Sequence, residues 1–175
     1  MSRSTVLAST VAALALFGAA YIGSTNIGGS TTVGSAQLQP GLAAAAQQKP
    51  AGPLVEVFKT PTCGCCSQWV EHMRANGFNV RTTDMNDISE IKKSRGVPDQ
   101  VQSCHTAVVN GYVVEGHVPA ADVHRMLKEK PAVLGIAVGG MPVGSPGMEY
   151  PGTKPQAYDV MSFDKTGATR VFAKH

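Results

Sequence analysis

The 175-residue sequence predicts a mixed α/β domain that is followed by a C-terminal extension of different composition. Residues 54–58 alternate apolar and polar side chains as a short strand does. Residues 66–76 repeat apolar side chains at the spacing of a helix that packs on a core. Asn110-Gly111 is typical of a tight turn between antiparallel strands. With 43% hydrophobic residues, the chain can build an ordinary core.

The first helix is expected to begin at a cluster of cysteines, Cys63-Gly64-Cys65-Cys66. Thr60-Pro61-Thr62 ends the preceding strand, and the helix then runs from about Cys66 to Asn76. Gly77 is placed to close it in a left-handed cap. One stripe of this helix has the spacing i, i+3, i+4 and i+7: Cys66, Trp69, Val70 and Met73. Cys66 and Trp69 are therefore expected to face the core.

The elements that follow complete the order of a thioredoxin-like domain. They are a strand at 78–82, a helix that starts at 87–90 and ends near 95–98, strands at 106–109 and 112–115, and a helix from Pro119 to about Glu129. The full order is β-α-β-α-β-β-α. A helical segment separates the second and third strands, which argues against the metallochaperone fold with its order β-α-β-β-α-β.

The chain divides by composition into residues 1–22, 23–53, 54–130 and 131–175. Residues 54–130 are expected to form the thioredoxin-like, metal-binding domain. Residues 131–175 are a Gly/Pro-rich extension with a methionine-containing loop and a terminal β-hairpin. This hairpin is expected because residues 158–164 and 168–173 alternate on either side of Lys165-Thr166-Gly167.

Residues 1–22 have the composition of an export signal. Arg3 precedes an uncharged run of 17 residues from Val6 to Ile22. This run is long for a cleavable signal and marginal for a membrane span, so a signal peptide and a retained membrane anchor both stay open. Residues 23–53 are mostly small and polar and are expected to be a flexible linker. We therefore expect a periplasmic protein that meets the membrane only through its N-terminal segment.

Charge gives no sign of a nucleic-acid partner. The formal net charge is +3, but residues 54–130 carry nine Lys and Arg against nine Asp and Glu. The surplus lies on Arg3, Lys49 and the C-terminal tail. No basic stripe is present that could follow a phosphate backbone, so nucleic-acid binding is not expected.

The four cysteines carry the chemistry of the chain. Cys63 and Cys66 have the spacing of redox dithiols and lie at a strand-to-helix turn, where the helix dipole favours thiolate over thiol. Cys65 is a third thiol in the same turn and would invite disulfide scrambling. Three thiolates within one turn suit soft, closed-shell cations, so Cu(I) is favoured over zinc.

Other uses of such cysteines are less consistent with the spacing. Haem attachment needs a histidine directly after the second cysteine, and Ser67 follows Cys66. A zinc ribbon needs a second Cys-x-x-Cys pair, and an iron–sulfur centre prefers wider spacing. Two alternatives stay open: a structural disulfide, and a thiol–disulfide oxidoreductase in which Cys63 attacks and Cys66 resolves.

Further candidate ligands lie outside the cysteine turn. In thioredoxin-like domains the loop before the third strand usually carries a cis-proline beside the redox turn, and Cys104-His105 stands at that place. Cys104 therefore offers a fourth sulfur and His105 an imidazole. Met141 and Met148 are thioether candidates in the Gly/Pro-rich loop. The remaining histidines are expected at the surface: His72, His117, His124 and His175.

Three segments resemble a known family. They are Thr60 to Cys66 with Trp69, Ser103 to Thr106, and Met141 to Met148. The pattern is similar to the exported bacterial metal-binding family that includes the copper-resistance protein CopG, over roughly Leu54 to Tyr150. The resemblance implies a periplasmic thioredoxin-like domain that binds copper and supports copper redox chemistry. It also implies one set of copper ligands: Cys63, Cys65, Cys66 and Cys104.

We therefore expect a periplasmic protein that holds one or more Cu(I) ions in a cysteine-thiolate site. Its partners are expected to be copper ions and other periplasmic copper-handling proteins. Oxidoreductase activity on copper ions or on protein disulfides is left open, and the alternative function is thiol–disulfide exchange by Cys63 and Cys66.

Overall fold

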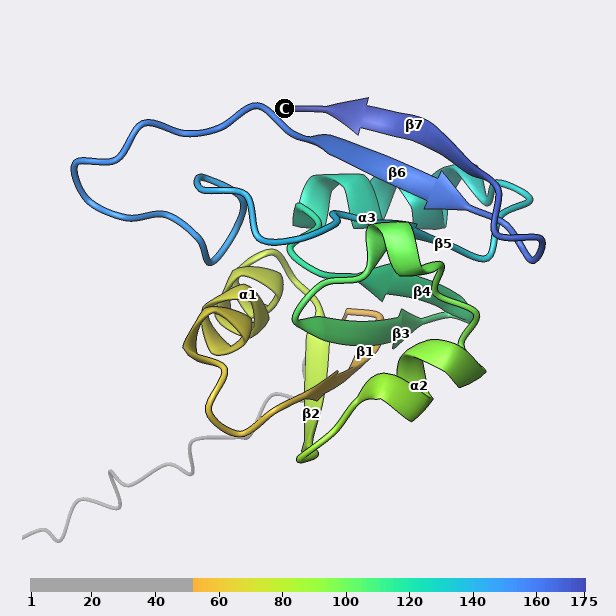
Figure 1. The fold of residues 1–175 in the computed structure, drawn as a ribbon, viewed down its shortest axis with the longest axis horizontal. Helices are drawn as coiled ribbons and strands as arrows, with labels where there is room; N and C mark the ends of the chain where they lie inside the picture. The colour runs from red at the N-terminus through yellow and green to blue at the C-terminus, as the bar shows by residue number, and fades with distance from the viewer. Residues whose placement is uncertain (1–51) are drawn as a thin grey trace, which may run out of the picture. The chain divides into compact units, whose positions relative to one another are not determined.

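The computed structural model describes residues 52–175, which form a layered α/β arrangement around one sheet (Figure 1). The export or anchor segment at 1–22 lies outside the described residues, as does the linker except for its last two positions. In the described part, no helix has the length and apolar character needed to cross a membrane.

Strands and helices alternate along the first half of the described chain, and strands dominate the second half. The elements are β1 (Leu54–Lys59), α1 (Gly64–Ala75), β2 (Asn79–Asp84), α2 (Ser89–Ser94), the 3-10 helix η1 (Asp99–Val101), β3 (His105–Val109), β4 (Tyr112–Glu115), α3 (Ala120–Glu129), β5 (Gly135–Ala137), β6 (Asp159–Phe163) and β7 (Thr169–Lys174). The expected α/β class is confirmed.

All seven strands belong to one sheet in the order β2-β1-β3-β4-β5-β6-β7. β1 and β2 are parallel, while β3 is antiparallel to β1 and β4 is antiparallel to β3. β5 is parallel to β4, and the hairpin β6–β7 follows on its far side. The C-terminal extension therefore continues the sheet (Figure 1).

The terminal hairpin matches the expected segments, but β5 has no counterpart among the expected elements. It has three residues, Gly135 to Ala137, and all three are buried. A strand that is covered on both faces shows no alternation of apolar and polar side chains, so neither its length nor its pattern marks it.

The two faces of the sheet carry separate apolar clusters. On one face, α1 and α3 contribute Trp69, Met73, Val123 and Met126 to the larger cluster. On the other face, Val97 and Val101 pack with side chains of β4, β5 and β6. The expected core stripe of α1 is confirmed, since its buried residues are Cys66, Trp69, Val70 and Met73.

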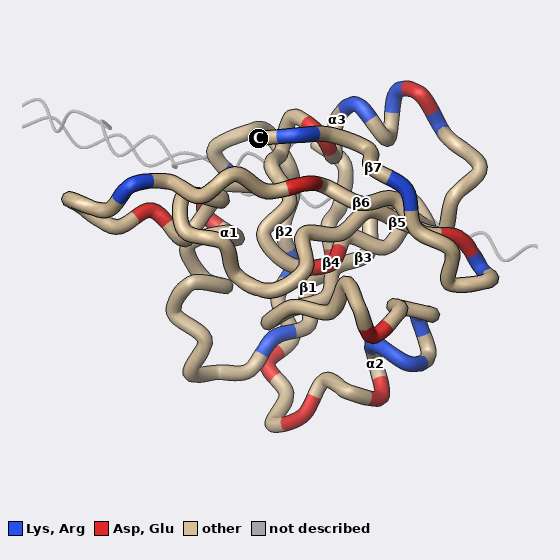
Figure 2. The backbone as a smooth tube through the Cα atoms, turned by 45° about the horizontal axis from the view of Figure 1, so that its top comes forward, with Lys and Arg blue, Asp and Glu red and all other residues tan. Residues whose placement is uncertain are grey.

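Local backbone conformation agrees with the turn residues of the sequence. Gly77 follows α1 with a φ of +86°, the left-handed conformation expected for the residue that closes a helix. Asn110 and Gly111 have φ angles of 47° and 85°, so the β3–β4 hairpin uses a turn with two left-handed residues. Acidic and basic residues are interspersed along the described chain (Figure 2).

Candidate metal centre

The cysteine turn lies between the end of β1 and the start of α1. The Cys63 N–H donates to the Thr60 carbonyl at 3.2 Å, which tightens the turn. Cys63 is the N-cap of α1, and its sulfur accepts from the Cys66 N–H at 3.3 Å. This contact satisfies one of the backbone N–H groups that the first turn of α1 leaves without a helical partner.

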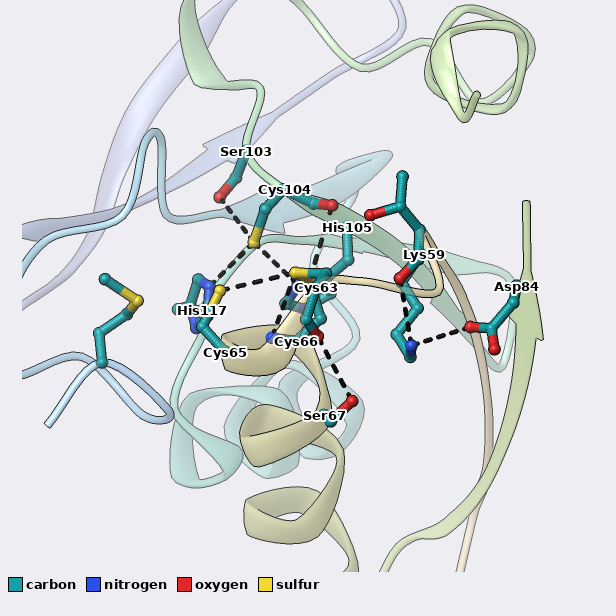
Figure 3. Close-up of a disulfide and its surroundings, with 12 residues drawn as sticks. Lys59, Cys63, Cys65, Cys66, Ser67, Asp84, Ser103, Cys104, His105 and His117 are labelled. Atoms are coloured by element: carbon teal, nitrogen blue, oxygen red, sulfur yellow. Dashed lines mark hydrogen bonds and ion pairs between the residues drawn. A yellow bond between two sulfur atoms is a disulfide. The ribbon is translucent and has the colours of Figure 1, made fainter. Parts of the chain in front are cut away.

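Cys63 and Cys66 are joined by a disulfide in this structure, with their Cα atoms 5.3 Å apart. Cys65 and Cys104 are free thiols, and both are half-buried. The Cys65 sulfur lies 3.5 Å from the Cys63 sulfur. The pair with the Cys-x-x-Cys spacing is therefore placed to open and close a disulfide beside two further thiols (Figure 3).

Cys104 is distant from this turn in the sequence and immediately precedes β3. Its sulfur and those of Cys63, Cys65 and Cys66 all lie within 4.8 Å of one another. The Cys66 sulfur is also 3.7 Å from the Cys104 carbonyl oxygen. The proximity expected between Cys104 and the cysteine turn is confirmed.

His117 is part of this centre, and its expected position at the surface is wrong. Its side chain is 0% exposed, and Nε2 lies 2.9 Å from the Cys104 sulfur. Gly116, with a φ of +69°, turns the chain inward after β4. On the opposite side of the ring, Nδ1 lies 2.8 Å from the Pro146 carbonyl oxygen. A carbonyl can only accept, so Nδ1 carries the proton and Nε2 presents its lone pair to Cys104.

The other histidines expected at the surface are arranged differently. His124 and His175 are exposed, while His72 is half-buried. The Nε2 atom of His72 accepts from the Ala120 N–H at 3.1 Å. His117 carried no sequence signal, because a single histidine after a strand has no ligand spacing. The clue that the sequence offers is that His117 lies two residues after an apolar strand that ends at Glu115.

His105 lies deeper than Cys104, on the face of the sheet that α1 covers. Its ring centroid is 4.4 Å from that of Trp69 and 5.1 Å from that of His117. Nδ1 is 3.4 Å from the Cys104 sulfur, and Nε2 has no hydrogen-bond partner among the described residues. Burial holds the pKa of His105 well below its ordinary value, so the ring is neutral at pH 7.

Burial also controls the protonation of the neighbouring groups. It raises the pKa of the Cys104 thiol to about 12, with the nearby Cys65 as a second cause. It lowers the pKa of His117, which keeps this imidazole neutral. A metal ion that binds the Cys104 sulfur would replace the thiol proton, because its positive charge stabilises the thiolate.

The two candidate thioether ligands differ in their exposure to solvent. Met148 is 7% exposed, whereas Met141 is 51% exposed. The Tyr150 hydroxyl lies 3.7 Å from the Met148 sulfur. Gly147 packs directly on the start of α1, where a Cβ atom would stand 2.8 Å from the Cys65 carbonyl oxygen and from the Trp69 nitrogen. The loop of the C-terminal extension therefore covers the cysteine turn.

The donor atoms fall into two groups that share one sulfur. The first group is the four cysteines, and the second is Cys104, His105 and His117. Within each group, the donor atoms lie within 4.8 Å of one another. Sulfur and imidazole donors suit soft or borderline cations, and a shared thiolate can bridge two of them. Each group therefore offers donors that suit a soft or borderline metal ion, and the Cys104 sulfur is common to both.

Comparison with known proteins gives similar solved structures. "Copper resistance protein copG- Form 2" is 44% identical, with a TM-score of 0.67, and the match covers 71% of this chain and 98% of that chain. "Copper resistance protein copG- Form 1" is 45% identical, with a TM-score of 0.66 and coverages of 70% and 96%. A family model described as "Protein of unknown function, DUF411" matches residues 101–148. No curated protein matches the chain.

Proposed function

The chain belongs to the CopG family of copper-resistance proteins, and we propose that it is a periplasmic protein that holds Cu(I) in a cysteine-thiolate site. The observation that carries the proposal is the meeting of four sulfur atoms within 4.8 Å. They come from one helix start and from a strand far away in the sequence. Such a cluster fits a soft cation that thiolates can bridge.

We assign each donor a role in handling copper as cargo. In the reduced protein, Cys63 exchanges the ion at the mouth of the site, Cys65 and Cys66 bridge, and Cys104 closes the cluster. His117 Nε2 adds a nitrogen donor because its lone pair already faces the Cys104 sulfur at 2.9 Å. Met148, which the extension loop buries, is proposed as a thioether donor. Zinc also binds sulfur and nitrogen but gains little from a thioether, so copper is favoured.

The disulfide supports a redox role within the same proposal. When the Cys63 and Cys66 thiolates each give one electron to a Cu(II) ion, the two sulfurs form one disulfide bond and two Cu(I) ions result. The electrons balance without a further reactant. Cys65, Cys104 and His117 lie outside the disulfide and remain as donors for Cu(I). In this role the protein is an oxidoreductase that acts on copper ions, and a dithiol reductant must reopen the disulfide before each further turnover.

We also propose that residues 54–130 form a thioredoxin-like domain and that residues 1–22 direct the chain to the periplasm. The order β2-β1-β3-β4, with β1 parallel to β2 and an antiparallel β3–β4 hairpin, supports the first proposal. The uncharged run from Val6 to Ile22 supports the second. Cell fractionation tests it, and N-terminal sequencing of the exported protein distinguishes signal cleavage from a retained anchor.

Thiol–disulfide exchange with proteins is the second candidate function. It is favoured by the Cys63–Cys66 disulfide at the N-terminus of α1, where an attacking Cys63 thiolate would be stabilised. In this function Cys63 forms a mixed disulfide with a substrate and Cys66 resolves it. Cys65 and Cys104 would then have no required part, whereas the copper proposal needs both.

Metal analysis of the exported protein tests the copper proposal. The protein is purified anaerobically from the periplasm of copper-treated cells, and its copper and zinc contents are measured. We expect copper in excess over zinc, and loss of most of the copper when Cys63, Cys65, Cys66 and Cys104 are replaced by Ser together. Copper at background level in the parent protein, with active disulfide exchange, would favour the second function.

A further inference from the structure

A buried ion pair lies behind the loop that carries Cys104. Lys92 of α2 and Glu115 of β4 approach to 2.5 Å, and their side chains are 8% and 0% exposed. They lie on the α2 face of the sheet, whereas His105 packs against Trp69 on the other face. Neither Lys92 nor Glu115 has a role in the copper site described above.

The Glu115 carboxylate binds the chain on both sides of Cys104. One oxygen, Oε1, accepts from the Ser103 N–H at 2.7 Å, and the other, Oε2, accepts from the Thr106 hydroxyl at 2.6 Å. Thr106 and Glu115 are opposite one another in the β3–β4 pairing, so both side chains point to the same face. The two contacts therefore enclose the dipeptide Cys104-His105.

Lys92 and Thr106 hold the Glu115 carboxylate in place. Lys92 Nζ also donates to the Thr106 hydroxyl at 3.1 Å, so Lys92, Glu115 and Thr106 form a closed triangle. A buried carboxylate that accepts three hydrogen bonds is fixed in orientation, because each lost hydrogen bond leaves a buried polar group less well satisfied. The triangle is thus a rigid support under one end of β3.

The stability of the fold does not by itself explain why Lys92 and Glu115 occupy these buried positions. A buried ion pair is often no more stabilising than apolar side chains of similar size, because both charges lose their water. Val97 and Val113 nearby show that this face of the sheet is otherwise packed with apolar groups. A carboxylate at position 115 does what an apolar side chain cannot do, which is to accept from the Ser103 backbone.

We infer that Glu115 is a positioning residue that fixes residues 103–106, so that the Cys104 sulfur stays between His117 and the cysteine turn. Ser103 is held from the other side as well, since its hydroxyl donates to the Gly140 carbonyl of the C-terminal extension. The segment that carries Cys104 is therefore clamped between the sheet and the extension. The clamp itself needs no copper, and its consequence for copper binding rests on the proposed function.

Thiol labelling of the metal-free protein tests the clamp directly. The full chain is reduced, and the rates at which iodoacetamide labels Cys104 and Cys65 are followed by peptide mass spectrometry. In Glu115→Gln the amide cannot accept from both sides, so we expect the ratio of Cys104 to Cys65 labelling to rise about tenfold as the loop opens more often. Thr106→Val keeps the ion pair and should raise this ratio less.

A variant on the same face controls for general destabilisation. Phe163→Leu removes buried apolar surface from the cluster that contains Val101 but touches none of the Glu115 hydrogen bonds, so it should lower thermal stability and change the labelling ratio less than Glu115→Gln does. If Glu115→Gln and Thr106→Val both give the parent ratio, or if Phe163→Leu raises it equally, the inference is overturned. This outcome does not depend on copper.

A double-mutant cycle then tests whether Glu115 acts on copper through Cys104. Retention of Cu(I) against a competing chelator is measured for the parent, Glu115→Gln, Cys104→Ser and the double variant. We expect Glu115→Gln to weaken retention by about tenfold in the parent, the size usual for an outer partner of a metal ligand. In the Cys104→Ser background it should have no further effect. If Glu115→Gln weakens Cu(I) retention equally in both backgrounds, the inference is contradicted. A parent protein that retains no Cu(I) would instead contradict the proposed function, and the labelling result would not be affected.

Discussion

The Nε2 atom of His117 lies 2.9 Å from the Cys104 sulfur, while Nδ1 of the same ring is held 2.8 Å from the Pro146 carbonyl oxygen. The extension loop therefore determines which nitrogen of His117 faces the cysteines. Orientation of a ligating imidazole through its second nitrogen is a common feature of metal sites. In this protein, the C-terminal extension completes the site in two ways, since it orients His117 and covers the cysteine turn.

Replacing His117 with Gln should weaken Cu(I) retention by about tenfold or more, because the site loses a nitrogen donor that is already oriented. His124→Gln is the matched control, since His124 is exposed and contacts the Asn76 carbonyl. Competition with a Cu(I) chelator measures both variants. Equal retention by the two variants would mean that His117 only fills space beside Cys104.

Cys65→Ser separates the two candidate functions. It removes one bridging thiolate but leaves the Cys63–Cys66 pair intact. We expect the number of Cu(I) ions bound per chain to fall clearly, while reduction of insulin disulfides hardly changes. Anaerobic copper titration and an insulin turbidity assay measure the two activities. Parent-level copper binding by this variant would move the preference to the oxidoreductase function.

Gly147→Ala should destabilise the protein by about 1–3 kcal/mol, because alanine must adopt a φ of +86° and its Cβ meets the backbone of α1. Gly152→Ala is the control that measures the cost of the left-handed backbone conformation alone. Gly152 has a similar φ of +78°, but nothing lies within 4 Å of the added Cβ. Thermal denaturation of both variants compares the two effects. An equal loss of stability in both would show that the loop does not pack tightly on the cysteine turn.

Much of this arrangement follows from the sequence, because its patterns are local. The apolar stripe of α1, the turn at Asn110-Gly111 and the terminal hairpin each depend on neighbouring residues. The position of Cys104 was predicted in another way, from the expected thioredoxin-like order, in which the loop before the third strand passes beside the redox turn. The three local features required no knowledge of how distant segments pack, whereas the place of Cys104 required an expected fold.

The parts that the sequence did not indicate depend on tertiary packing. β5 is identified by its pairing with β4 and β6, and three residues are too few to show a period. His117 is buried because Gly116 turns the chain inward and the extension covers the ring. The Lys92–Glu115 pair joins a helix to a strand 23 residues away, and no spacing rule links the two.

Replacing both Met141 and Met148 with Leu tests the extension loop as a source of thioether donors. Leucine conserves volume, so thermal stability without metal should fall by less than about 1.5 kcal/mol per site. We expect weaker Cu(I) retention against a chelator, with most of the loss coming from Met148, which is buried, and little from the exposed Met141. Equal retention by the double variant and the parent would show that the loop is structural.

Copper K-edge X-ray absorption of the anaerobically loaded protein tests whether the cysteines hold copper, because it reports which atoms surround the ion. The account predicts Cu(I) with a first shell dominated by sulfur, and loss of sulfur neighbours in the Cys65→Ser and Cys104→Ser variants. A first shell of nitrogen and oxygen alone, or a sulfur shell unchanged in both variants, would contradict it.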